Sequence, residues 1–336
     1  MIDFRLGIEN YLLHLGKVDT VEITNLCLLS GGAIQQNWLL DVTVNGAPLE
    51  TVLRTDSASS LEDSLSRAQE YAVFRQVFDA GVTVPEPLWL SVDPQWIGKP
   101  FFIMRRVAGT AAGHKIVRNA AMGGGRKVLA NRLGRELART HTIKYGQAEL
   151  DFLSRPAPTP ALYCINEYRA ALDASDMPQP TLEWGLYWLE QNAPEAVKEL
   201  VLCHNDFRTG NYMVTEQSLT GVLDWEFAAW GDPMVDIGWF CAKCWRFGAV
   251  QNEAGGISAR ADFYSGYEAV SGEKIDRKAV LYWEVMAAMR WAIIAIKQGD
   301  RHISGREPSL ELALTRHIVP ELELDIMHMT QEADNA

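Results

Sequence analysis

The chain has 336 residues, and its 43 acidic against 31 basic side chains give a formal net charge of −12. Hydrophobic residues make up 48% and charged residues 22%, a mix that predicts a globular protein with a substantial core and excludes a disordered chain. Binding along a nucleic-acid backbone needs clustered Lys and Arg, so the acidic balance argues against a nucleic-acid partner.

Signals for export or membrane insertion are missing from the sequence. Asp3 and Glu9 stand where a secretory signal would have a basic start and an apolar run. The most apolar late stretch, 285–296, contains Arg290 and is shorter than the ~20 residues that cross a bilayer. Five cysteines in a chain of this length do not indicate a disulfide framework. We therefore expect a cytoplasmic protein without a membrane partner, and the oligomeric state stays open.

The first hundred residues predict strands around one helix. Apolar runs over 21–29, 38–44 and 49–54 favour three antiparallel strands, because Asn45-Gly46 is a strong hairpin turn. A helix is expected over 59–80, where apolar residues recur at helical spacing. That helix should end at a glycine, Gly81.

A second hairpin is expected after this helix, with strands over 88–92 and 101–104. Helices dominate from Gly109 onward, so we place the boundary between two lobes at about 104–109. The expected lobes are 1–106, which is rich in strands, and 107–336, which is mainly helical.

The second lobe should contain several helices and one compact β patch. A loop or a short helix is expected over 109–126, and the β patch over 201–224. The remainder from Pro233 onward should be helical, with its longest helix over 277–296. The other expected helices cover 127–143, 160–175 and 181–199.

The segment 204–211 carries the most informative pattern. It places Asp206 on a loop after an apolar strand, Asn211 five residues later, and Asp224 at the end of a nearby strand. Oxygen ligands of this kind suit Mg²⁺, which completes its shell with water and substrate phosphates. Protein kinases use the same spacing in H-R-D-x-x-x-x-N followed by a metal-binding Asp. A plain turn whose Asp and Asn only bond to the backbone is the alternative.

These motifs resemble the aminoglycoside phosphotransferase family, the small-molecule kinases with a protein-kinase-like fold. The likeness runs over about 25–245 and is greatest to the kinase-like domains that accompany acyl-CoA dehydrogenases. It implies an α+β, two-lobed fold with an antiparallel sheet and one helix in the N-terminal lobe and a mainly helical C-terminal lobe. It also implies ATP and Mg²⁺, with 1–106 as the nucleotide-binding lobe and 107–336 as the lobe with the catalytic loop and the acceptor site. Besides 204–211, the motifs are Leu29-Ser30-Gly31-Gly32-Ala33, Met104-Arg105-Arg106-Val107-Ala108-Gly109, Leu223-Asp224-Trp225-Glu226 and Gly231-Asp232-Pro233.

The resemblance assigns roles in the catalytic loop. Asp206 matches the catalytic base, and Asn211 and Asp224 match the magnesium ligands. His204 matches a loop histidine that we interpret as an anchor, and Arg208 belongs to the same catalytic motif. Asp236 is expected to cap a helix and brace this loop.

The nucleotide contacts follow from the same resemblance. Arg54 stands where the family has a phosphate-binding lysine, and its planar fork can also hold phosphate. Glu70 is its expected partner, although it could instead be a solvated carboxylate on a helix face. The turn Ser30, Gly31, Gly32 and Ala33 should cover phosphate, and the backbone of Met104, Arg105, Arg106 and Val107 should contact adenine.

The motifs are compatible with several functions. A kinase of a small-molecule hydroxyl is favoured, an aminoglycoside-modifying kinase and a nucleotide-binding pseudokinase are alternatives, and a protein kinase is disfavoured because no peptide-docking segment fits after Asp224. Cys241 and Cys244 form a C-x-x-C without a second pair, so we expect packing rather than zinc. Tryptophans are concentrated in the second lobe, and those that face the cleft would favour a flat or partly apolar acceptor over an aminoglycoside.

Overall fold

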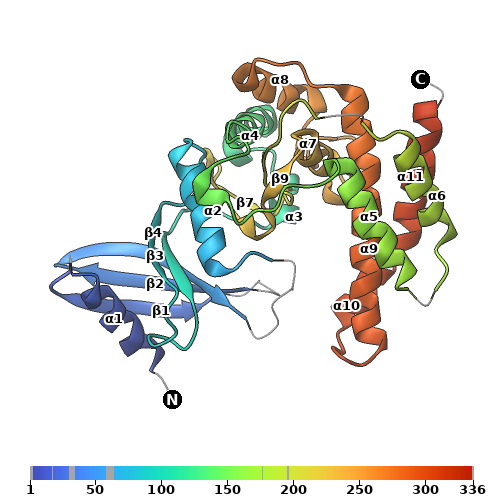
Figure 1. Cartoon of the computed structure of the whole chain (residues 1–336). Helices are drawn as coiled ribbons and strands as arrows, with labels where there is room; N and C mark the ends of the chain where they lie inside the picture. Colours follow the sequence, from blue (N-terminus) through green and yellow to red (C-terminus); the bar gives the residue numbers. More distant parts are fainter. Residues whose placement is uncertain are drawn as a thin grey trace.

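The computed structural model describes residues 3–16, 18–29, 35–57, 64–175, 177–194 and 197–334. A sheet built from the first part of the chain lies beside a larger helical part, with α2 between them (Figure 1). The fold is α+β, as the sequence predicts.

The N-terminal sheet has five antiparallel strands in the order β1-β2-β3-β5-β4. The predicted hairpin between β2 and β3 is confirmed, since Asn45 and Gly46 both have positive φ and Val44 pairs with Ala47. The strands are β1 (Val21–Leu28), β2 (Gln35–Val44), β3 (Ala47–Asp56), β4 (Pro87–Ser91) and β5 (Phe101–Arg105).

Helices cover both faces of this sheet. Helix α1 (Phe4–His14), which the sequence analysis does not predict, packs Ile8, Tyr11 and Leu12 onto one face. Helix α2 (Arg67–Asp79) packs onto the other. The one-helix expectation for this lobe is therefore incomplete.

Helix α2 begins later than expected. The expected start at residue 59 lies outside the described residues, and 64–66 are not helical. A capping box between Ser66 and Gln69 fixes the first turn at Arg67, because the two side chains satisfy each other's backbone N–H groups.

The rest of the chain is mainly helical. Helix α3 is the short helix that the sequence allows within 109–126, whereas α6 differs from its expected bounds and ends at Gln191 rather than at 199. The helices are α3 (Gly113–Arg118), α4 (Arg126–Thr140), α5 (Pro160–Asp173), α6 (Pro180–Gln191), α7 (Met234–Cys241), α8 (Arg260–Ser271), α9 (Arg277–Ile303), α10 (Leu310–Arg316) and α11 (Val319–Asp334).

Helix α9 is the spine of a helical bundle with α5, α6 and α11 (Figure 1). It is long and apolar enough by length and composition to cross a membrane, but 72% of its apolar window is buried inside the protein. Its apolar side chains thus have packing partners within the fold.

Helices α4 and α8 approach each other through glycines. A Cβ atom on Gly134 would lie 2.1 Å from the carbonyl oxygen of Phe263, and one on Gly266 would lie 1.9 Å from that of Asn131. Backbone therefore meets backbone here, and any side chain would force the two helices apart.

Candidate active site

The predicted catalytic loop lies between two short strand pairs, three of whose strands fall in the predicted β patch 201–224 and one beyond it. Strand β6 (Val201–Cys203) leads into the loop and pairs with β9 (Ala229–Gly231). Strand β7 (Tyr212–Val214) leaves it and pairs with β8 (Leu219–Val222), which ends just before Asp224. The two strand pairs therefore bring the loop 204–211 and Asp224 close together.

Asp236 braces the start of the loop. Its two carboxylate oxygens accept the backbone N–H groups of His204, at 2.8 Å, and of Asn205, at 2.7 Å. The expected helix cap is wrong, because Asp236 lies in the first turn of α7 with its side chain directed to the loop. Asn205 has a left-handed backbone, with φ of 59°, so the brace holds a tight turn.

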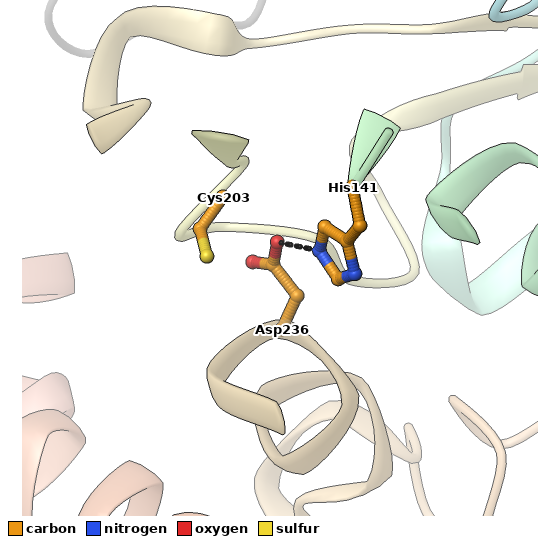
Figure 2. A group of neighbouring side chains, drawn as sticks. All are labelled: His141, Cys203 and Asp236. Atoms are coloured by element: carbon orange, nitrogen blue, oxygen red, sulfur yellow. Dashed lines mark hydrogen bonds and ion pairs between the residues drawn. The ribbon is translucent and has the colours of Figure 1, made fainter. Parts of the chain in front are cut away.

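His141 supports Asp236 through a hydrogen bond to its carboxylate (Figure 2). Its Nε2 lies 3.1 Å from Oδ2 of Asp236, and its Nδ1 lies 2.9 Å from the hydroxyl of Tyr267. Because a carboxylate only accepts, Nε2 donates to Asp236, and Nδ1 shares a hydrogen bond with the tyrosine hydroxyl. Burial raises the pKa of Tyr267, which keeps its hydroxyl a donor. The sequence analysis missed both residues.

Cys203, His141 and Asp236 place one ligating atom each within 4.8 Å of one another, as in a metal site. Burial raises the pKa of Cys203 well above its ordinary value, so the thiol stays protonated, and both oxygens of Asp236 already accept N–H groups. These contacts fit a structural support for the catalytic loop rather than a metal site.

His204 anchors the loop, in agreement with its interpretation from sequence. Its buried ring donates from Nε2 to the carbonyl of Leu223 at 2.8 Å and accepts the N–H of Asp206 at Nδ1. The ring also packs on Trp225, with centroids 4.4 Å apart. It therefore ties the catalytic loop to the strand before Asp224.

Asp206 is held from three sides. Its Oδ1 accepts from Nε1 of Trp239 at 2.9 Å and from Nε of Arg208 at 3.1 Å. Its Oδ2 accepts from Nδ2 of Asn211 at 2.5 Å. The side chain is 14% exposed, so it keeps one accessible edge in a fixed orientation.

Asn211 and Asp224 form a donor set that fits a divalent cation. The N–H of Leu223 bonds to the carbonyl of Asn211 at 2.8 Å, which brings the two candidate ligands together. Since Nδ2 of Asn211 faces Asp206, its Oδ1 is the atom left to ligate. Oδ2 of Asp224 accepts no hydrogen bond from the residues that the structure describes.

Asp224 is ionised. Burial favours its neutral form, but the guanidinium of Arg54, 2.8 Å from Oδ1, outweighs burial and holds the pKa of Asp224 below its ordinary value. One carboxylate and one amide oxygen are hard ligands that suit Mg²⁺.

Arg54 and Glu70 form the expected buried pair. Nε of Arg54 lies 3.0 Å from Glu70, which is 1% exposed, so Glu70 is not a solvated helix carboxylate. Burial opposes the charge of Arg54, yet Glu70 and Asp224 together raise its pKa. The guanidinium therefore stays charged beside the candidate metal ligand.

A second arginine, which the sequence analysis missed, completes this network. Arg67, one turn before Glu70 on α2, is buried and pairs with Glu70 and with Asp56. It also lies 3.9 Å from Glu226, just beyond Asp224. A helical i, i+3 spacing of Arg67 and Glu70 was the available signal.

Glu226 is a buried carboxylate, 5% exposed, at the join of the two lobes. Nε2 of Gln35 donates to it at 2.7 Å, and its backbone carbonyl accepts the N–H of Leu65 at 2.9 Å. Burial raises its pKa to about 7, against the opposing charge of Arg54. It is therefore only partly ionised near neutral pH.

The remaining residues predicted to contact the nucleotide differ in how the structure places them. Ser30, Gly31, Gly32 and Ala33 lie outside the described residues. Met104 is buried, and the backbone N–H groups of Arg105 and Arg106 bond to the carbonyls of Glu86 and Glu50, so they are not free for adenine. Within the described residues, the Val107 backbone has no such bond.

A cavity of about 440 Å³ adjoins the catalytic loop at Asn205 and helix α7 at Trp239. Its charged lining residues are Arg155, Arg290, Glu167 and Glu226, so carboxylates do not outnumber guanidinium groups. Arg155 contacts the ring of Tyr145, and Arg290 contacts the ring of Trp239 and the carbonyl of Asn205. Its aromatic lining comes from distant parts of the chain: Phe152, Tyr163, Tyr168, Phe227, Trp230, Trp239 and Trp283.

The two thiols of the C-x-x-C pattern fit packing. Burial raises the pKa of Cys241 and of Cys244 to about 12, so neither is a ready metal ligand or nucleophile.

Sequence comparison places 25–272 within the pattern of the phosphotransferase enzyme family. One curated relative, acyl-CoA dehydrogenase family member 10 of Mus musculus, is 27% identical over 205 residues. That match covers 58% of this chain and 18% of the relative, so the chain spans only about a fifth of the relative's length.

Solved structures share the fold. A Ralstonia eutropha protein provisionally named an aminoglycoside phosphotransferase superposes with a TM-score of 0.75 and 19% identity, covering 97% of this chain and 98% of that one. A spectinomycin phosphotransferase in complex with ADP and spectinomycin gives a TM-score of 0.55 and 13% identity, covering 97% and 98%.

Proposed function

Since this chain belongs to the phosphotransferase enzyme family and is a small-molecule phosphotransferase, we propose that it moves the γ-phosphoryl of Mg-ATP to a hydroxyl of an organic acceptor. The observation that carries this proposal is the meeting of Asp206, Asn211 and Asp224 beside an aromatic cavity. A solved relative of the same fold holds ADP, which supports nucleotide use.

In this proposal the N-terminal lobe holds the nucleotide. Arg54, fixed by Glu70, contacts the α/β-phosphates, and its charge is kept by the two carboxylates around it. The backbone at Val107 is the part of the lobe junction left to contact adenine. Arg54 thus substitutes for the lysine of related kinases, which argues against a pseudokinase.

Asn211 and Asp224 would hold the magnesium ion, with the Oδ1 of Asn211 and the Oδ2 of Asp224 as ligand atoms. When bound, Mg²⁺ supplies neutralisation of charge on the phosphate oxygens. The backbone bond between Leu223 and Asn211 keeps these two ligands at a fixed spacing.

Asp206 orients the acceptor hydroxyl and accepts its proton as the γ-phosphoryl leaves the nucleotide in line. Its carboxylate does not have to reorganise, because Trp239, Arg208 and Asn211 already fix both oxygens. No covalent enzyme intermediate is needed.

The cavity favours a hydroxylated, partly apolar acceptor over an aminoglycoside. A polycation needs an excess of carboxylates, whereas this lining has two arginines against Glu167 and the partly ionised Glu226. The aromatic side chains instead offer flat apolar surface.

The test is a screen of the purified protein with Mg-ATP against hydroxylated metabolites and antibiotics, read out as phosphorylated product by mass spectrometry. We expect turnover with a hydroxylated organic molecule and little with kanamycin. Efficient phosphorylation of kanamycin, at ~10⁴ M⁻¹s⁻¹ or better, would overturn the acceptor assignment. Absence of transfer to any acceptor would overturn the phosphotransfer itself.

A further inference from the structure

Trp239 belongs both to the cavity wall and to the surroundings of Asp206. Its indole lies on α7 and is 3% exposed, and the cavity is lined by the same residue. Its Nε1 donates to Oδ1 of Asp206 at 2.9 Å. An indole N–H can only donate, so this contact favours a carboxylate in one orientation. The acceptor side of the cleft therefore touches the candidate base directly.

Arg290, from α9, fixes this indole and the adjacent backbone together. Its guanidinium carbon lies 4.7 Å from the centroid of the Trp239 ring, a stacking distance for a cation and an aromatic face. Its Nη1 donates to the carbonyl of Asn205, the residue before Asp206, at 2.5 Å. One side chain thus bridges the ring and the loop, and it lines the cavity as well.

We propose that Trp239, held by Arg290, is a positioning residue for the phosphoryl transfer. The indole N–H fixes Oδ1 of Asp206, so that the carboxylate meets the acceptor hydroxyl in a single orientation. A hydrogen bond to a charged oxygen is stronger than a neutral one, which suits it to this task. This inference rests on the proposed function, because it requires Asp206 to be the base.

The substitution Trp239→Phe tests the role, since it keeps an aromatic ring in the wall and removes the donor. We expect kcat to fall about 10-fold to 100-fold, as small misplacements of reacting groups do. The KM values for ATP and for the best acceptor of the screen should stay within about twofold, because the ring remains. A purely structural role would lower the melting temperature without lowering kcat at unchanged KM.

Trp245→Phe is the matched control. Trp245 packs against Trp239 with centroids 5.1 Å apart, and its ring lies 4.6 Å from the guanidinium carbon of Arg208. A phenyl ring keeps an aromatic face for both contacts, and the buried Nε1 of Trp245 has no hydrogen-bond partner among the described residues. Losing that N–H should leave kcat within about twofold of wild type. A drop equal to that of Trp239→Phe would show that the cluster matters only as packing and would overturn the inference.

A second readout does not depend on turnover. The ¹H–¹⁵N indole signal of Trp239 is identified by its loss in Trp239→Phe. In Asp206→Ala it should move upfield and exchange faster with solvent, and an unchanged signal would overturn the bond. Wild-type turnover with an unimpaired Trp239→Phe would overturn this inference alone. Absence of wild-type turnover would overturn the proposed function and the role of Trp239 with it.

Discussion

The two sides of the cleft are built from different interactions. On the side that we propose for the nucleotide, Arg54, Arg67 and Glu70 form a buried network of ion pairs, which extends to the partly exposed Asp224. On the acceptor side, aromatic rings and stacked arginines surround the cavity, as at Trp239. Ion pairs with fixed geometry suit a ligand of constant charge, such as a triphosphate. Aromatic surface suits a ligand whose chemistry differs from one relative to the next, so the two sides answer different demands.

The largest effect is expected where the nucleotide side meets the candidate metal. Asp224→Ala should reduce Mg²⁺-dependent turnover by about 10⁴-fold, because it removes a ligand of an ion that contributes several kcal/mol to the transition state. Coupled assays over a range of Mg²⁺ concentrations measure this, with circular dichroism to check folding. Near-normal Mg²⁺-dependent activity would show that the metal assignment is wrong.

A second variant separates the base from the nucleotide site. Asp206→Asn keeps the shape of the side chain but cannot take a proton, so turnover should fall about 10²–10⁴-fold. Binding of Mg-ATP, measured by calorimetric titration, should stay close to wild type. If affinity fell as far as the rate, Asp206 would serve the metal or the fold instead.

The ion-pair network should matter for stability as well as for binding. Glu70→Ala leaves two buried guanidinium groups, Arg54 and Arg67, without this partner, which should lower the free energy of unfolding by about 3–5 kcal/mol. Urea unfolding measures the loss. Asp79→Ala, at an exposed position of the same helix, is the control and should change stability by less than about 0.5 kcal/mol. Equal effects of the two would contradict the network.

The smallest effect concerns Glu226, where the two sides join. Its pKa of about 7 lies above the ordinary value of 4.5, so the folded protein binds a proton that the unfolded chain releases, and this stabilisation is lost as pH rises through 7. Glu226→Gln does not titrate. Its stability relative to wild type should therefore rise by about 1–1.5 kcal/mol between pH 6.0 and 8.5. A difference in urea unfolding that stays flat with pH would exclude the shift.

The difference between the two sides also explains what the sequence could predict. Asp206, Asn211 and Asp224 stand at spacings that the chemistry requires, and Arg54 could be placed by its strand. The cavity could not be foreseen, because its lining comes from separate stretches between 65 and 290 that carry no common spacing. Whether a given tryptophan faces the cleft or the core depends on tertiary packing: Trp239 lines the cavity, whereas Trp225 is fully buried.

Other misses had signals in the sequence. Helix α1 could have been predicted from Asp3, whose side chain caps it, and from the helical spacing of the apolar residues Ile8, Tyr11 and Leu12. His141 carried no such signal, because its partner Asp236 is 95 residues away in the chain. Local patterns thus predict elements well, while long-range braces appear only in the folded structure.

The close contact of α4 and α8 at Gly134 and Gly266 also affects the support behind the catalytic loop. Helix α4 ends next to His141 and α8 carries Tyr267, so the spacing of the two helices is also the spacing of that hydrogen bond. One added methyl group at Gly134 or Gly266 would draw Tyr267 away from His141 and slacken the support behind Asp236. An alanine allele at either glycine would thus count as loss of function in a genetic screen, although every side chain facing the substrates is unaltered.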